Sequence, residues 1–444
     1  MTPLQLTDHP FRPQQLIEAA SILHPALDAL TSDRPQVLSV QTRNPALWTW
    51  IWALCHKTGH TFMPLNPELS REQTQQILNT AGNALLLDLD DKGQLTVLQH
   101  SAGSNIDADI RLIIHTSGSS GQPRGVMHKQ TGIEAAAQAA NQHLAFSQKD
   151  LWLLCLSPWH IGGIAIMERA RLAQAQVAVT EQFDPRLVWQ QLQQHPVTHI
   201  SLVPAMLARL LSISKQQAPP TTLRCALIGG GPLSRQLYQQ AHAQGWPLCI
   251  SYGLSEAGSQ VATLYNPPDD WQPGDVGPLL DGIELKVGAN SGNFGPIMLR
   301  GPMIMAGYLN AERRLGVGLD NNGWFTSSDL GRLTPGGELQ ILGRGDDMII
   351  SAGINIHPAL IEQTLEAHPD VQEVAVLGTP DPTYGAVVTA IIVGDIDPAE
   401  LDAWCRKQFP SAQRPRRIIP VDELPLLSNG KIDKQTLQQM ASQT

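Results

Sequence analysis

Residues 116–125 combine hydroxyls, glycines and a cation in a pattern suited to holding phosphate. The segment reads Thr-Ser-Gly-Ser-Ser-Gly-Gln-Pro-Arg-Gly and lies between apolar runs at 112–114 and 126–127. Glycines let backbone N–H groups turn toward an anion, hydroxyls add donors, and the Arg124 fork matches phosphate oxygens. We therefore expect a phosphate-binding loop between two strands rather than a Gly/Ser linker. It is not a Walker A motif, which needs Gly-Lys followed by Ser or Thr and a helix.

A second constellation is the run Ser251-Tyr252-Gly253-Leu254-Ser255-Glu256, which follows the strand-like segment 247–250. A tyrosine ring can cover a base, a serine hydroxyl can donate to a phosphate, and a carboxylate can bind Mg²⁺. The alternative is a buried tyrosine followed by a Ser-x-x-Glu helix cap.

Three further features lie in the last third of the chain. Asp329 stands between hydroxyl residues and a glycine, where a carboxylate can accept both ribose hydroxyls or merely form an Asx-turn. The charged segment Gly-Arg-Gly-Asp-Asp at 343–347 sits where the composition changes, which suits a hinge. Lys431 lies on a predicted tight turn, and in isolation it reads as a solvated surface residue.

The elements that must position these residues change in character along the chain. Short apolar runs alternate with helical patterns from Val37 to about 265, which predicts parallel α/β layers. Short strands and turns follow between 273 and 344, as in a small β-barrel-like subdomain. About a hundred residues of α+β pattern remain, enough for a small mobile C-terminal domain. The predicted fold is therefore α/β, with a large layered N-terminal domain over 1–344 and a lid domain over 345–444.

Composition limits the function classes. The 444 residues predict more than one core, and the net charge of −10 disfavours a general binder of nucleic acid or anionic membranes. Five scattered cysteines without a CxxC pair favour buried thiols in a reducing compartment over disulfides or zinc. No signal peptide is visible at the start, and the apolar stretch 151–166 is too interrupted to span a membrane. We expect a cytoplasmic protein.

Taken in order, these motifs resemble those of the adenylate-forming superfamily, which includes acyl-CoA synthetases, non-ribosomal adenylation domains and luciferases. The likeness runs from about Val37 to Lys434 and includes the phosphate loop, Tyr-Gly-Leu-Ser-Glu, Ser-Asp-Leu-Gly, Gly-Arg-x-Asp-Asp and a Gly-Lys near the end. Several positions depart from the usual pattern without removing a function. Arg124 replaces a lysine, Ser255 a threonine, and Ala352 a glycine.

The resemblance implies a two-step ligase reaction with ATP and coenzyme A as substrates and Mg²⁺ as cofactor. A carboxylate attacks the α-phosphate of ATP, and a thiol then displaces AMP from the acyl-adenylate. Lys431, Ser255, Glu256, His160 and Arg124 are the implied catalytic residues, with Glu256 as the metal ligand. Asp346 is the implied hinge, and Ser351, Ala352 and Gly353 face the coenzyme A tunnel. The implied ATP and AMP site comprises Thr116, Ser117, Gly118, Ser119, Ser120, Gly121, Arg124, Gly125, Gly230, Gly231, Pro232, Ser251, Tyr252, Gly253, Leu254, Ser255, Asp329, Arg344 and Lys431.

The acid itself is less well defined. His160, in Trp-His-Ile-Gly-Gly, occupies the position of an acyl-pocket gate, although a satisfied core histidine is the alternative. The Phe-Asp usual in amino-acid-activating members is absent. The pattern is similar to the o-succinylbenzoate–CoA ligases of menaquinone and phylloquinone synthesis, and also to benzoate-type aryl-CoA ligases. The implied acyl-binding residues are His160, Ser201, Tyr252, Gly253, Ser259 and Gln260.

Other readings remain open at this point. The chain can instead load a carrier protein rather than coenzyme A, or bind a nucleotide without catalysis. The joint presence of Lys431, Glu256 and Asp329 argues against the non-catalytic reading. The partners expected are a small carboxylic acid, ATP and coenzyme A, with no nucleic acid and no stable membrane insertion. The oligomeric state is left open, with a homodimer as one option.

Overall fold

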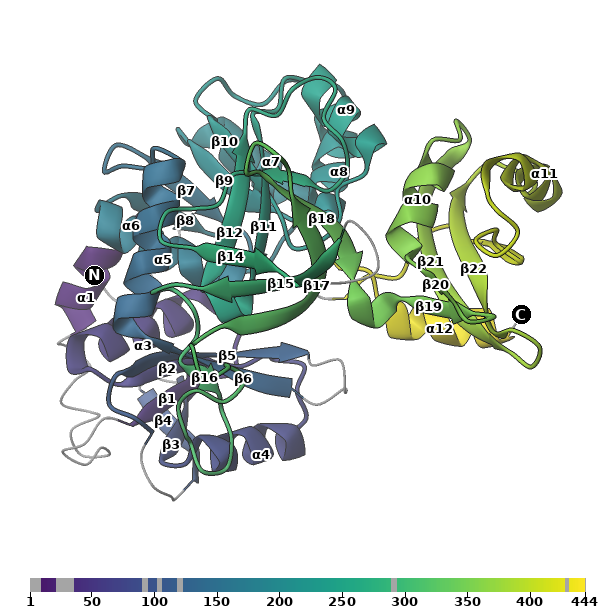
Figure 1. The fold of residues 1–444 in the computed structure, drawn as a ribbon. Helices are drawn as coiled ribbons and strands as arrows, with labels where there is room; N and C mark the ends of the chain where they lie inside the picture. The colour runs from purple at the N-terminus through teal and green to yellow at the C-terminus, as the bar shows by residue number, and fades with distance from the viewer. Residues whose placement is uncertain are drawn as a thin grey trace.

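Two stacked sheets with helices between them form most of the chain before residue 265 (Figure 1). The structure is a computed structural model and describes residues 9–20, 36–89, 95–101, 106–117, 123–288, 294–427 and 431–443. Within those ranges no helix is both long and apolar enough to cross a membrane.

The first sheet has seven strands in the order β16-β6-β5-β2-β1-β3-β4. Its centre is parallel, because β1 pairs with β2 and β3, and β2 pairs with β5, in the same direction. Its outer strands β4, β6 and β16 run antiparallel to their neighbours. The strands are β1 (Val37–Val40), β2 (Thr61–Pro64), β3 (Ala84–Leu89), β4 (Leu95–Ser101), β5 (Ile110–Ser117), β6 (Pro123–Lys129) and β16 (Gly307–Tyr308).

The second sheet has six strands in the order β12-β11-β10-β9-β7-β8, all parallel except the edge strand β12. The strands are β7 (Leu151–Leu154), β8 (Gln176–Val179), β9 (His199–Leu202), β10 (Cys225–Ile228), β11 (Leu248–Leu254) and β12 (Ser259–Tyr265). The helices of these two layers are α1 (Pro13–Ala19), α3 (Pro45–Thr58), α4 (Arg71–Ala81), α5 (Gln130–His143), α6 (Ile161–Ala173), α7 (Pro185–Gln194), α8 (Pro204–Ser214) and α9 (Arg235–Ala243).

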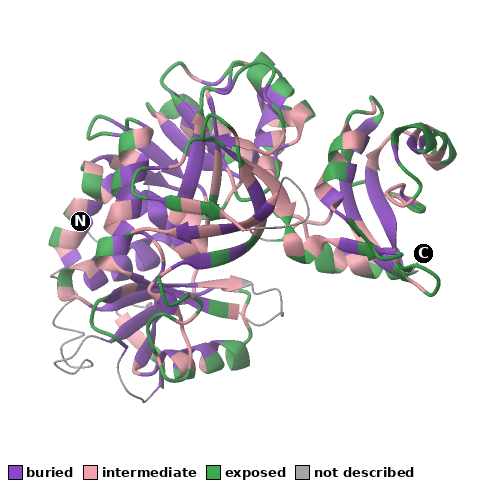
Figure 2. Ribbon diagram, viewed as in Figure 1, coloured by how far each residue is buried: buried purple, intermediate pink, exposed green. Residues whose placement is uncertain are grey.

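The layering follows from alternation along the strands, since successive side chains point to opposite faces of a sheet. Leu38 of β1 and Trp152 of β7 belong to one apolar cluster with α3 and α6, which therefore lie between the two sheets. Leu153, the next residue of β7, belongs to a different cluster with α7, α8 and α9 on the opposite face. Figure 2 shows the result, with burial concentrated in the strands of both sheets.

A third, five-stranded antiparallel sheet follows, in the order β13-β18-β17-β15-β14. It is the β-rich segment predicted between 273 and 344. Its edge strands are β13 and β14. The strands are β13 (Asp275–Gly277), β14 (Glu284–Val287), β15 (Gly295–Arg300), β17 (Phe325–Leu333) and β18 (Leu339–Arg344).

The elements after β18 form the separate lobe at the right of Figure 1. This lobe has apolar clusters of its own, drawn from residues 349–441. A hairpin and a three-stranded sheet in the order β21-β22-β23 are packed with three helices. The elements are β19 (Ile349–Ser351), β20 (Ile354–Ile356), α10 (Pro358–Glu366), β21 (Val371–Asp381), β22 (Gly385–Gly394), α11 (Pro398–Gln408), β23 (Arg417–Pro420) and α12 (Lys434–Gln443).

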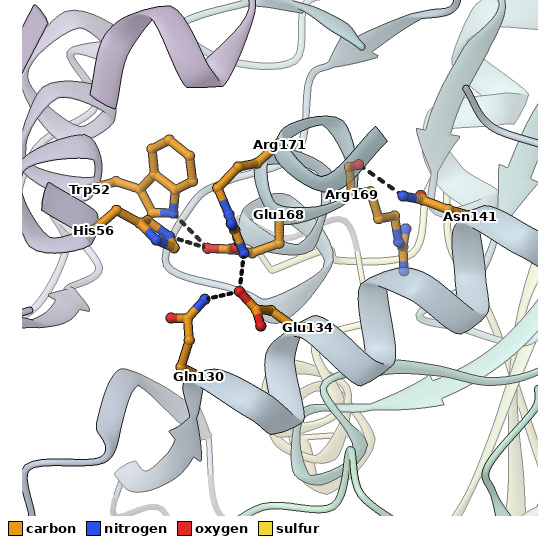
Figure 3. Close-up of polar contacts among 8 residues, drawn as sticks. All are labelled: Trp52, His56, Gln130, Glu134, Asn141, Glu168, Arg169 and Arg171. Carbon is orange, nitrogen blue, oxygen red and sulfur yellow. Dashed lines mark hydrogen bonds and ion pairs between the residues drawn. The ribbon is translucent and has the colours of Figure 1, made fainter. Parts of the chain in front are cut away.

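Glu168, a buried acid on α6, ties three helices together (Figure 3). It accepts a hydrogen bond from Trp52 Nε1 at 2.8 Å, contacts His56 Nε2 at 2.7 Å, and accepts from Arg171 Nε at 3.1 Å. Arg171 also donates to Glu134 of α5 at 2.8 Å. Burial alone raises the pKa of Glu168, but the charges and donors of His56 and Arg171 outweigh it and hold that pKa at about 2. The network therefore fixes α6 against α3 and α5.

This network predicts a pH-dependent stability. Because the pKa of Glu168 falls from its usual 4.5 to about 2, its contribution is present above pH 4.5 and is lost as the pH falls toward 2. We expect Glu168→Gln to lower the free energy of unfolding at pH 7 by about 3 kcal/mol. Urea denaturation at a series of pH values measures the difference, which should shrink between pH 4.5 and pH 2.

The matched control is Glu284→Gln, which removes an exposed partner of Arg300 and should change little. If the free energies of unfolding of the wild type and Glu168→Gln differ by the same amount at pH 7 and at pH 2.5, the account is contradicted.

Candidate active site

The predicted phosphate loop joins two antiparallel strands, as expected. In β5 and β6, Thr116 lies opposite Arg124 and Ser117 opposite Pro123. The Thr116 hydroxyl donates to the Arg124 carbonyl at 3.4 Å. The predicted phosphate-binding residues Gly118, Ser119, Ser120 and Gly121 lie outside the residues that the structure describes.

The tyrosine motif lies inside a strand rather than after one. Strand β11 extends to Leu254, and a 3₁₀ turn over Ser255–Ala257 follows. The capping alternative is therefore wrong, because the motif opens no α-helix. Gly253 is required here by a close approach, since a Cβ built on it would lie 2.1 Å from the Ser259 carbonyl oxygen. Ser259 itself has a φ of 128°, a strained conformation for a residue with a side chain.

Asp329 lies in the middle of β17, opposite Arg344 of β18. The Asx-turn alternative is therefore wrong. The Tyr252 hydroxyl donates to Asp329 Oδ2 at 2.7 Å. Burial raises the pKa of Tyr252 well above its usual value, and the Asp329 carboxylate raises it further, so the hydroxyl keeps its proton. The predicted base-covering ring and the predicted ribose-binding carboxylate are thus joined directly.

Glu256, the predicted metal ligand, is held by a residue that the sequence did not single out. The Tyr308 hydroxyl donates to Glu256 Oε1 at 2.6 Å. The Arg124 guanidinium carbon lies 5.7 Å from the centre of the Tyr308 ring. Nearby, the buried His128 donates from Nε2 to the Ser255 carbonyl at 2.8 Å, and burial lowers the pKa of His128 to about 4.

Lys431, from the C-terminal lobe, lies near these residues. A Cβ built on Gly230 would lie 3.7 Å from Lys431 Cε, which places the lysine beside the glycine turn after β10. Although the residue keeps contact with solvent, desolvation of its ammonium lowers the pKa of Lys431, while the charges of Asp329 and Glu256 oppose this shift. The structure therefore brings Lys431 into one charged cluster with Asp329 and Glu256, which lie far earlier in the chain.

His160 is the N-cap residue of α6 and lies close enough to Lys431 for that charge to act on it. Burial lowers the pKa of His160 to about 4, and the positive charge of Lys431 lowers it further. The ring is therefore neutral near pH 7. The assignment of His160 as the gate of the acyl pocket stays a prediction.

Arg169, behind the predicted acyl-binding residues, escaped the sequence reasoning. It is only 2% exposed, and its Nη2 donates to Ser259 Oγ at 3.0 Å. Its guanidinium also lies 5.3 Å from the Trp152 ring centre. Burial lowers the pKa of Arg169 to about 10, so it stays charged at neutral pH. The available signal was a single arginine at the end of the largely apolar segment Ile-Ala-Ile-Met-Glu-Arg. Such a residue is normally interpreted as lying on the exposed surface of a helix.

Arg169 and two of the predicted acyl-binding residues each have a buried polar atom without a protein partner among the described residues. Within the described part of the chain, no hydrogen-bond partner is found for Arg169 Nε, Ser201 Oγ or Gln260 Oε1. Ser201 and Gln260 are each 5% exposed. An unsatisfied buried polar atom is costly, so a group that supplies partners to several of them would bind favourably. An oxygen-rich or anionic substrate group meets that requirement.

The predicted hinge residue borders this cluster through Arg344, and the predicted tunnel residues lie on a hairpin of the C-terminal lobe. Arg344 Nη2 donates to Asp346 Oδ2 at 2.7 Å, and Lys434 pairs with the neighbouring Asp347. Ser351, Ala352 and Gly353 form the end of the β19–β20 hairpin, where the Ala352 N–H donates to the Tyr384 carbonyl at 2.8 Å. Ala352 has a φ of 50°, a conformation that favours the glycine it replaces.

Comparison with known proteins places this cleft in a family. The model of the AMP-binding enzyme family matches residues 14–309, and that of the AMP-binding enzyme C-terminal domain matches residues 360–431. A 2–succinylbenzoate–CoA ligase of Listeria monocytogenes serotype 4b (strain F2365) is 35% identical over 334 residues, which are 74% of this chain and 70% of the relative.

Solved structures of related enzymes have the same fold as this chain. The o-succinylbenzoate CoA synthetase of Bacillus subtilis, in complex with its acyl-adenylate intermediate, superposes with a TM-score of 0.81 at 27% identity, covering 96% of this chain and 92% of that one. ATP-bound MatB from Rhodopseudomonas palustris has a TM-score of 0.83 at 23% identity, with 96% and 92% covered, and supports the fold alone.

The chain belongs to the AMP-binding enzyme family. The layered α/β fold and the adenylate-forming resemblance are thereby confirmed, and the enzyme is an AMP-forming acid–CoA ligase.

Proposed function

We propose that this enzyme joins o-succinylbenzoate to coenzyme A, with conversion of ATP to AMP and pyrophosphate. The observation that carries the choice of acid is the buried Arg169, whose Nε has no protein partner among the described residues and whose Nη2 donates to Ser259 next to Gln260, where Oε1 also lacks a partner. A monocarboxylic aryl acid uses its one carboxylate in the reaction and offers nothing to this arginine. A dicarboxylate offers a second. Relatives and solved neighbours named for this acid agree with the choice.

The first step forms the acyl-adenylate. A carboxylate oxygen attacks the α-phosphorus, an O–P bond forms, and the P–O bond to pyrophosphate breaks. Both reactants are anions, so charge neutralisation is the main contribution of the protein. Arg124 and the backbone of the phosphate loop hold the β- and γ-phosphates, Ser255 bonds the α-phosphate, and Lys431 stabilises the charge that develops in the transition state.

Tyr252 and Asp329, which are hydrogen-bonded to each other, hold the nucleoside. The Tyr252 ring covers the adenine beside Gly230, Gly231 and Pro232, while Asp329 and Arg344 hold the ribose. The adenine-binding side of the site also includes the backbone of strand β11 at Ser251, Gly253 and Leu254. The hydrogen bond from Tyr252 fixes Asp329, so that its carboxylate is oriented before ATP binds.

The residues present fit a magnesium ion. Glu256 supplies a carboxylate, the ligand class that Mg²⁺ prefers, and a hydrogen bond to Oε1 leaves a second oxygen for the cation. When bound, Mg²⁺ neutralises phosphate charge. The Bacillus subtilis synthetase has been solved with ATP and a magnesium ion, which supports this assignment.

The second step transfers the acyl group to coenzyme A. The thiol sulfur attacks the acyl carbonyl, a C–S bond forms, the C–O bond to AMP breaks, and the thiol proton passes to solvent. The domains implied by the two lobes are 1–344 and 345–444. Rotation at Asp346 then withdraws Lys431 and brings Ser351, Ala352 and Gly353 to the thiol tunnel. The biosynthetic place of this reaction is menaquinone or phylloquinone formation in the cytoplasm.

The acid specificity predicts a selective effect at Arg169. Wild-type enzyme should convert o-succinylbenzoate far better than benzoate, read as acyl-CoA by mass. Arg169→Met should lower kcat/KM for o-succinylbenzoate about 100-fold, because a desolvated ion pair is lost, while turnover of benzoate changes little.

Arg169→Lys serves as the conservative control and should restore part of the preference. Equal losses for both acids would contradict the assignment to the second carboxylate. Transfer to a pantetheinylated carrier protein, with coenzyme A inert, would overturn the coenzyme A ligase reading.

The role of Lys431 predicts a separation of the two steps. Lys431→Ala should slow pyrophosphate release by 100-fold or more, since an electrostatic stabiliser of the transition state is removed. It should still convert a supplied acyl-adenylate and coenzyme A into the thioester at the wild-type rate. The measurement is single-turnover kinetics of each half-reaction, with the exposed Lys407→Ala as control. Loss of both half-reactions would contradict the assigned role.

A further inference from the structure

We propose that Tyr308 is a positioning residue, which orients Glu256 toward the metal and couples it to the phosphate loop. The inference rests on the proposed function, because it concerns the metal carboxylate of that same site. Tyr308 lies on β16, a two-residue strand far along the chain from both partners.

The backbone around Tyr308 ties two parts of the nucleotide site together. The Leu309 N–H donates to the Gly125 carbonyl at 2.7 Å, at the end of the phosphate loop. The Met305 N–H donates to the Glu256 carbonyl at 2.7 Å. Residues 305–309 therefore bind both strand β6, at the end of the phosphate loop, and the backbone of Glu256. They hold these two segments in a fixed relative position.

The Tyr308 side chain repeats this connection. Its hydroxyl donates to Glu256 Oε1 at 2.6 Å, and its ring lies 5.7 Å from the Arg124 guanidinium carbon. The ring is packed edge-on against Phe325, with centres 6.5 Å apart. Gly318 leaves room for it, since a Cβ there would lie 2.5 Å from the ring.

This arrangement restricts the motion of the carboxylate. A hydrogen bond to an ionised acceptor is short and strong, and it removes the free rotation of Glu256 about its last bond. Partners of this kind orient metal ligands, and their loss typically costs about 10–100-fold in metal affinity. The phenol ring also lies against Arg124, so a shift of Arg124 or of Glu256 displaces Tyr308 and thereby the other residue.

Tyr308→Phe tests the inference, because it keeps the ring contacts with Arg124 and Phe325 and removes only the hydroxyl. We expect the affinity of the enzyme for Mn²⁺, measured by electron paramagnetic resonance with saturating α,β-methylene-ATP, to fall about tenfold. The Mg²⁺ concentration that half-saturates pyrophosphate release should rise by the same factor. Conversion of a supplied acyl-adenylate to thioester should not change.

The matched control is Tyr265→Phe, whose hydroxyl makes a long 3.5 Å contact with the Arg224 carbonyl away from the cleft. It should leave both metal readouts unchanged. An unchanged Mn²⁺ affinity in Tyr308→Phe overturns the inference. The Mn²⁺ measurement needs no acid, so it separates this outcome from a failure of the proposed function, which would show as absent acyl-CoA formation by the wild type.

Discussion

Repulsion between two anions is the constraint on which this structure depends. A carboxylate must reach the α-phosphorus of a tetraanionic nucleotide, although the chain itself has a net charge of −10. The site offsets this repulsion by gathering the cations Arg124, Arg344 and Lys431 from separate parts of the chain. Each is held by a contact of its own, with the Tyr308 ring, with Asp346, or with the charges of Asp329 and Glu256. The layered sheets hold these elements rigidly enough for the charges to meet.

The split into two lobes follows from the same constraint. In the proposed function, Lys431 assists adenylation and must then leave the path of the thiol. The lobe that carries Lys431 has apolar clusters of its own, which suits such a withdrawal. The proposed acid-binding end of the site is instead on α6, which the Glu168 network fixes against α3 and α5. In Figure 3, Glu168 and Arg169 point away from each other, so one side chain anchors the helix while its neighbour is free to reach Ser259.

Much of the fold was predictable because local patterns and burial agree. The apolar run at 37–40 predicts a strand and the proline-started amphipathic pattern at 185–195 predicts a helix, and the structure has β1 over Val37–Val40 and α7 over Pro185–Gln194. For the strand that contains Asp329, the sequence predicts only residues 323–325, because the hydroxyl-rich residues that follow resemble a turn. The structure has β17 over Phe325–Leu333, and pairing with β18 makes these residues extended.

Residues of the site were predictable where they stand in ordered motifs. Arg169 and Tyr308 were missed for a different reason. Each gains its role from a long-range contact, with Ser259 or with Glu256, and the sequence around each has no distinctive spacing. Long-range contacts of this kind are set by the assembly of sheets, which local propensity does not encode.

Oxygen transfer from the acid to the nucleotide tests the central claim most directly. The acid is labelled with ¹⁸O in its reacting carboxylate and incubated with ATP, Mg²⁺, coenzyme A and enzyme, and the AMP is examined by mass. Attack of the carboxylate on the α-phosphorus predicts one ¹⁸O atom in each AMP released. Unlabelled AMP, or ADP in place of AMP, would contradict the acyl-adenylate route.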